Sequence, residues 1–185
     1  MIKRKVKFKR KTKKDFDLKW VIKITALAFF ITLIFYGTSE LILKQVNIFL
    51  GILVILIFIL LGALFDMIGI ATASASEIPF HSMASQKVKG AKTALKLIKE
   101  AEKVSALCND VIGDICNIIS GGAGILIATN IAYYYKMDSI LVTLIITSII
   151  AAGTIGCKAL GKILAVNESE GIVYKTASVV KYFIK

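Results

Sequence analysis

Histidine and proline are almost missing from this sequence: His81 is its single histidine and Pro79 its single proline. One histidine supplies neither the His/Cys spacing of a zinc site nor the Ser-His-Asp set of a hydrolase. The sequence also lacks a glycine loop of the kind that cradles phosphate. A lone histidine in a polar loop is more often solvated than catalytic. We therefore expect a protein that is not an enzyme.

Cysteine is scarce as well, and Cys108, Cys116 and Cys157 all fall within apolar stretches. In such surroundings cysteine usually packs as a small hydrophobic residue. Cys108 and Cys116 are two helical turns apart, roughly 12 Å at the rise of an α-helix, which is too far for a disulfide.

Apolar residues, in contrast, make up 57% of the 185 residues, and the mean hydropathy is +0.77. A helix that crosses a hydrocarbon core of about 30 Å needs about 20 mostly apolar residues. Four stretches meet this requirement, at about residues 20–43, 46–76, 107–135 and 139–166. The sequence predicts an all-α, polytopic membrane protein with a transmembrane domain at 20–166, cytoplasmic helices at 77–106, and tails at 1–19 and 167–185.

Basic residues are distributed very unevenly. Of 24 Lys and Arg, eleven lie in residues 1–23, six in 77–104 and five in 158–185, which leaves only Lys44 and Lys136 for the other two loops. Basic residues are retained on the cytoplasmic side of a membrane, so we expect both termini and the central segment in the cytoplasm, at a cell inner membrane. The basic tail then lies against anionic lipid headgroups. Lipid, and not nucleic acid, is the expected partner of the net charge of +12.

The basic beginning followed by an apolar run also resembles a secretory signal peptide. The run is too long for one, and it ends in Thr38, Ser39 and Glu40 without a small-x-small cleavage site. An uncleaved membrane anchor is the expectation.

The central segment contains a predicted helix. Pro79 is expected to end the second long helix, since the residue before a proline disfavours helical geometry. Residues 87–107 then place apolar side chains at helical spacing with lysines elsewhere on the wheel. Such a helix either lies on the inner membrane surface or packs under its own bundle. Residues 167–185 predict a second amphipathic surface helix.

Three carboxylates stand inside the apolar stretches: Asp66, Asp110 and Asp114. A carboxylate in hydrocarbon costs at least about 2.5 kcal/mol and persists only beside a cavity or a partner. Asp66 and Asp114 are expected at similar depths on adjacent antiparallel helices, so their carboxylates can meet. Such residues indicate a functional site.

Amide side chains extend this predicted site. Asp110 and Asp114 share a helix face that reaches Asn117, while Asn109 and Gly113 begin a neighbouring face that also reaches Asn117. Oxygen ligands without histidine or cysteine suit a hard cation such as Mg²⁺, Ca²⁺ or Na⁺. Two alternatives stay open: a protonated aspartate in an interhelical hydrogen bond, or Asp66 paired with a lysine such as Lys158 or Lys162.

Small residues are concentrated in the last two apolar stretches. Gly121, Gly122 and Gly124 either loosen the third helix, as in the broken helices of transporters, or allow close packing. The fourth stretch carries a run of small residues from Ala151 to Gly161. We expect that helix at the centre of the bundle.

Residues from about Ile48 to Phe183 resemble the transmembrane domain of the CorB/CorC and cyclin-M family of magnesium-transport proteins. Four segments carry the resemblance, in family order: FDMIGIATASASEI, GAKTALKLIKEAEKV, NDVIGDICN and GCKALGKILAVNESEGIVYK. The third is similar to the family's G-N-x-x-x-N signature, with Gly113 at its first asparagine and Asn117 at its second. Asp66 stands where the family has its first serine, although a SASE string lies at Ser74–Glu77.

The resemblance implies a homodimer in which dehydrated Mg²⁺ is held between helices by serine, asparagine and acidic oxygens. The paired CBS domains of the family are not in these 185 residues, and the first apolar stretch is additional. We expect a divalent-cation transporter or exchanger with Mg²⁺ bound by Asp66, Asp110, Asp114, Asn117 and Asn109. The alternatives are a non-transporting membrane adaptor or scaffold and a carrier of monovalent cations or protons.

Overall fold

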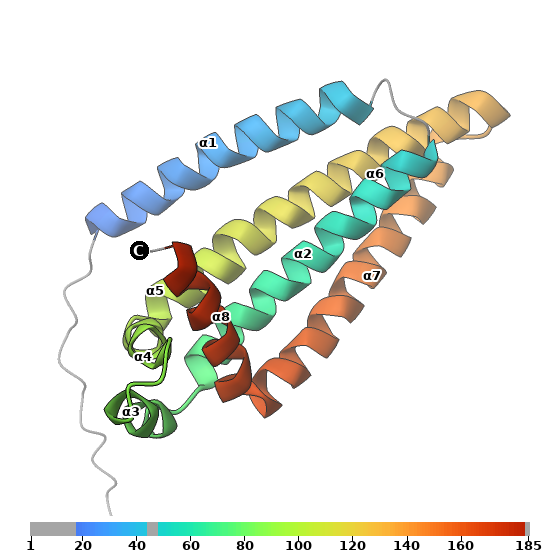
Figure 1. Ribbon diagram of the computed structural model, residues 1–185. Coiled ribbons are helices and arrows are strands. Elements are labelled where there is room, and N and C mark those ends of the chain that lie inside the picture. The colour runs from blue at the N-terminus through green and yellow to red at the C-terminus, as the bar shows by residue number, and fades with distance from the viewer. Residues whose placement is uncertain (1–17, 44–47, 184–185) are drawn as a thin grey trace, which may run out of the picture.

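The computed structural model describes residues 18–43 and 48–183, and these residues are almost entirely helical, without strands (Figure 1). The predicted basic tail at 1–19 lies outside this description except for its last two residues. The elements in chain order are α1 (Leu18–Leu43), α2 (Ile48–Ser74), α3 (Ile78–Ser85), α4 (Ala91–Lys99), α5 (Ala101–Ser105), the π-helix η1 (Ala106–Gly113), α6 (Asp114–Tyr135), α7 (Ser139–Asn167) and α8 (Ser169–Phe183).

Four helical segments in the described chain are long and apolar enough to cross a membrane. They are Leu18–Gly37, Ile48–Ser74, Ala101–Tyr135 and Ser139–Asn167. The predicted all-α class with four candidate transmembrane helices is therefore confirmed. The third segment begins six residues earlier than expected, at Ala101 instead of 107, because α5, η1 and α6 follow one another without a loop.

The helices α2, α6 and α7 run side by side, and α1 lies along α6 (Figure 1). Isoleucines of α2, Ile55 and Ile59, are buried against Ala123 and Ile127 of α6. A second cluster joins α6 to α7 through Ala128, Ala132 and Val142. The third candidate span is 56% buried, compared with 6% for the fourth.

The expectation that the fourth span lies at the centre is therefore wrong. Most small residues of α7 face outward, and a Cβ added at Gly153 or Gly156 would meet no atom within 4 Å. Only Gly161 of this group faces a neighbouring helix, where it lies against the Ala63 carbonyl of α2. The central positions belong to α2 and α6.

Two of the three glycines of α6, Gly122 and Gly124, allow close packing, and none of the three breaks the helix. The α6 helix continues without interruption through all three glycines. Gly122 lies against the Tyr36 ring of α1, and Gly124 lies against Ile150 of α7. The irregular winding occurs eight residues earlier, in η1.

Four short helices gather at one end of the long bundle: α3, α4, α5 and α8 (Figure 1). Their core contains Phe80 of α3, Ala94 of α4, and Val173 and Ala177 of α8, packed on Ala71 of α2. Of the two alternatives for the central amphipathic helix, the structure shows the one that packs under its own bundle. The apolar side of α8 contacts the same core.

Two boundaries at this end differ from the predictions. The helix α2 ends at Ser74. Pro79 stands in the first turn of α3, where backbone N–H groups have no acceptor within the helix, so the proline's lack of an N–H costs no hydrogen bond. The predicted helix at 87–107 is divided at Glu100, and its last part, α5, belongs to the third long segment. Residues 87–90 form the turn before α4, with positive φ at Lys87 and Gly90.

Replacing Gly90 by alanine is expected to destabilise the α4–α8 contact. Its φ of 91° is unfavourable for a residue with a Cβ, and that Cβ would lie 3.0 Å from Ser178 Oγ. We expect Gly90→Ala to lower the free energy of unfolding by about 1–2 kcal/mol, measured by denaturant unfolding in detergent. The control is Gly171→Ala on α8, where the nearest atom to an added Cβ is 3.9 Å away. Equal losses in both variants would contradict the role of Gly90.

Candidate cation site

One face of α2 presents a buried carboxylate between two glycines. Gly62, Asp66 and Gly69 follow the i, i+4, i+7 spacing of a helix face, and all three are buried. Asp66 is only 6% exposed. It lies eight residues before the end of α2, roughly 12 Å along the helix axis. The carboxylate is therefore well inside an apolar helix and needs a partner.

The facing helix presents Asn109, Gly113 and Asn117, which oppose the α2 residues in antiparallel order. Asn109 Oδ1 lies against the Gly69 Cα, where a side chain would collide with it. Asp66 lies opposite Gly113, because a Cβ at Gly113 would be 2.7 Å from Asp66 Oδ1. A Cβ at Gly62 would be 3.8 Å from Asn117 Oδ1. The missing side chains of the glycines are what let the two helices approach so closely.

Lys158 of α7 supplies the partner of Asp66. Its Nζ lies 3.2 Å from Asp66 Oδ2, and the two side chains are only 19% and 9% exposed. Gly161, one turn further along α7, lies against the backbone of α2 and brings the two helices close at this level. A buried pair of opposite charges is far less costly than either charge alone. The lysine alternative that the sequence left open for Asp66 is the arrangement the structure shows.

Asn109 carries an unsatisfied acceptor in the same interface. Its Nδ2 donates to Ser105 Oγ at 3.3 Å, while its Oδ1 is buried and accepts no hydrogen bond from any described residue. A buried acceptor without a partner costs about 1–3 kcal/mol. Such atoms in native structures often mark a place where an ion or a water binds.

The π-helix η1 sets which side chains face α2. It spans Ala106–Gly113 and ends directly opposite Asp66. Single π-helical turns within α-helices are frequent at functional sites, because their wider winding changes the direction of side chains. Here both Asn109 and Gly113 belong to the π-helix and face α2. The sequence contained no signal for this winding.

Asp110 and Asp114 lie on the adjacent face of the same helix and are exposed. Asp114 Oδ1 accepts a hydrogen bond of 3.5 Å from Asn117 Nδ2. The structure thus places Gly113 opposite Asp66, with Asn109 and Asn117 one turn to either side in the same interface, but leaves both Asp110 and Asp114 at the surface. Among residues 18–43 and 48–183, no three His, Cys, Asp or Glu side chains form a group that could hold a metal ion. Any ion at Asp66 would depend on amide and carbonyl oxygens.

The atoms that face Gly113 include two oxygens of the kind that bind hard cations. A Cβ added at Gly113 would lie 2.7 Å from a carboxylate oxygen, Asp66 Oδ1, and 3.3 Å from a backbone carbonyl oxygen, Cys108 O. The ammonium of Lys158 already places a positive charge on the same carboxylate. Oxygen donors and a negative charge are what Mg²⁺ or Na⁺ requires.

Fold and site together define the class: an α-helical membrane protein with four candidate spans and an ion pair buried between two of them. Comparison of the chain with protein-family models, with curated proteins and with solved structures finds no match. The resemblance to the CorB/CorC and cyclin-M family therefore stays a prediction that rests on the quoted segments alone.

Replacing one member of the ion pair is expected to destabilise the bundle. Asp66→Asn leaves the Lys158 ammonium buried without a countercharge, and we expect a loss of about 3–5 kcal/mol in the free energy of unfolding. The double variant Asp66→Leu with Lys158→Met removes both charges and is expected to recover most of this loss. Denaturant unfolding in detergent measures both, with Asp114→Asn as the exposed control. If the double variant is no more stable than Asp66→Asn, the pair does not couple α2 to α7.

Proposed function

We propose that this chain is a membrane transport protein whose cargo is a cation, with Mg²⁺ as the first candidate. The observation that carries the proposal is the buried Asp66, placed opposite Gly113 in the same helix interface that holds, one turn away at Gly69, the unpaired Asn109 oxygen. A carboxylate inside a membrane helix is costly, and in known membrane proteins it usually serves ion pathways or proton relays. The family resemblance supports the choice of a divalent ion.

The Lys158 ammonium gives this proposal its mechanism. A cation that binds Asp66 competes with Lys158, because both are attracted to the same carboxylate. With the lysine in place, the charge of Asp66 is balanced, and α2 and α7 pack closely. When a cation takes its place, the ammonium must find another position. Ion binding is thereby linked to a movement of α7 relative to α2.

Asn109 and Asn117 would complete the ion's coordination from the facing helix. Both side chains lie at the α2 interface, one turn on either side of Gly113. Asp110 and Asp114 are exposed on the next face of the same helix. They lie beside the buried interface as further acidic groups, and Asp114→Asn measures what this exposed face contributes.

The same proposal includes orientation and assembly. The distribution of basic residues supports an inner membrane location with both termini in the cytoplasm. The outward small residues of α7, including Gly153 and Gly156, are suited to close contact with a helix of a second copy, which supports a homodimer.

A specific observation favours a second function, that of a non-transporting membrane adaptor. The Asp66 carboxylate is already neutralised by Lys158, as a purely structural ion pair would be. In an adaptor, the pair would only hold α2 against α7, and the cytoplasmic surface would carry the function.

Cation-dependent stability distinguishes the two functions. For transport, we expect Mg²⁺ to raise the melting temperature of the purified protein in detergent, and Lys158→Met to show a larger rise, because the competing ammonium is gone. The variant Asp66→Leu with Lys158→Met should lose the response, since it lacks the carboxylate. Parallel titrations with Ca²⁺, Na⁺ and pH identify the ion, including the case of a monovalent cation or proton carrier.

Asp114→Asn is the matched control, since it removes one carboxylate from the exposed face. We expect it to keep most of the Mg²⁺ response, and uptake of Mg²⁺ into proteoliposomes should follow the same order among the variants. If Mg²⁺ changes the melting temperature equally in the wild type, Lys158→Met and the double variant, Asp66 does not bind the ion. The adaptor function would then be favoured.

A further inference from the structure

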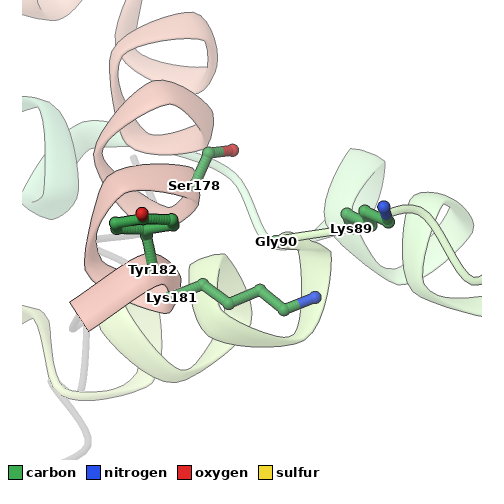
Figure 2. A pocket seen from close by; sticks show the side chains of 5 residues that line it. All are labelled: Lys89, Gly90, Ser178, Lys181 and Tyr182. Carbon is green, nitrogen blue, oxygen red and sulfur yellow. The ribbon is translucent and has the colours of Figure 1, made fainter. Parts of the chain in front are cut away.

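A basic hollow lies at the end of the bundle where α4 begins and α8 ends (Figure 2). Its cavity volume is ≈ 700 Å³, and an adjoining cavity of ≈ 340 Å³ shares three of its residues. We call the two cavities together the basic pocket. The first is lined by Lys89, Gly90, Ser178, Lys181 and Tyr182, and the second adds Lys87 and Lys92 among others.

The walls of the basic pocket are held by the packing of α4 against α8. Gly90 is buried and lies so close to Ser178 that a Cβ would be 3.0 Å from its Oγ. Directly beneath, Ala94 and Ala177 are fully buried in the core shared with α2. Ser178 Oγ donates to Tyr174 O at 2.9 Å. The hollow is therefore part of the folded structure and needs no rearrangement to form.

Four lysines line the basic pocket, and no carboxylate does. Lys87, Lys89, Lys92 and Lys181 are exposed, and none of them forms an ion pair with a carboxylate in the described part of the chain. Figure 2 shows two of these lysines: Lys181 projects from α8, and Lys89 lies on the turn before α4. Like charges gathered around one space repel one another, so an anion placed there would be strongly attracted.

The position of the basic pocket relative to the ends of the long helices indicates that the anion belongs to a lipid. The apolar helices α2 and α7 end at Ser74 and Asn167, and α8 begins two residues after α7 ends. The helices α4 and α8 that form the pocket lie at the end of the bundle where α2 and α7 end (Figure 1), so in a bilayer spanned by the long helices the pocket would be at the level of the lipid phosphates. Tyr182 on its rim is 84% exposed, and tyrosine is typical of that interface.

We propose that the basic pocket binds the phosphates of an anionic phospholipid headgroup. Two adjoining cavities and four lysines suit a headgroup with two phosphates, so cardiolipin should bind more tightly than phosphatidylglycerol. Basic pockets at the ends of membrane helices recognise such headgroups through charge and hydrogen bonds. This inference concerns a separate site and does not depend on cation transport.

The test is lipid-dependent thermal stability of the full chain in neutral detergent. Cardiolipin should raise the melting temperature, phosphatidylglycerol should raise it less, and phosphatidylcholine should leave it unchanged. In the variant Lys89→Gln with Lys181→Gln, we expect the apparent Kd for cardiolipin to rise about 25-fold, at about fivefold for each lysine.

The control variant is Lys96→Gln with Lys175→Gln, which removes the same charge from exposed positions of α4 and α8 that do not line the basic pocket. It should change the Kd by less than about twofold, because these two lysines do not line the pocket and cannot contact a headgroup held in it. Equal losses in the two double variants would show general attraction to a basic surface and overturn the proposal. Stabilisation by inorganic phosphate at the same concentration as cardiolipin would also overturn it, in favour of a soluble anion.

Discussion

Two opposite charges inside an apolar bundle constrain the rest of this structure. Asp66 and Lys158 lie on different helices, and neither is stable in hydrocarbon without the other. Their 3.2 Å contact therefore fixes how α2 and α7 are rotated toward each other. Gly161 allows the necessary approach, and Gly113 leaves room for the carboxylate on the other side. The outward position of the remaining small residues of α7 follows from the same rotation.

The contact between α2 and the third long segment has a different physical basis. It depends on the absence of side chains at Gly62, Gly69 and Gly113, and polar atoms fill the space that results. Without a hydrophobic force between helices in lipid, such close packing and polar contacts hold membrane helices together. The same feature that stabilises the bundle also places the oxygens of Asn109 and Asn117 in the interface that contains the Asp66 carboxylate.

Hydropathy predicted the four spans because their length is dictated by membrane thickness, a property of the whole segment. The sequence predicted less well which face each helix turns toward its neighbours. Asp110 and Asp114 were expected to face Asp66, yet the neighbouring face with Asn109 and Gly113 does so. Apolar residues surround both faces, so periodicity did not separate them. The lysine partner was foreseen only as an alternative, since a contact between α2 and α7 depends on tertiary packing.

Some predicted helix boundaries were wrong for a related reason. The lysine-rich segment at 87–107 has one helical periodicity, but its break at Glu100 arises where α4 leaves the end of the bundle and α5 enters it. Pro79 was correctly recognised as a boundary residue, although it begins a helix and does not end one.

The π-helix η1 contains a degree of freedom that a regular α-helix lacks. Each residue of an α-helix turns the chain by about 100°, so a return of this segment to α-helical winding would rotate the part before it by a comparable angle relative to α6. Asn109 would then leave its place opposite Gly69, and rotation in one direction would bring Asp110 toward α2, whereas Cys108 already lies against Gly69. A rotation by about one residue's turn would therefore bring Asp110 to the α2 interface. Neither the length nor the number of the spans would change.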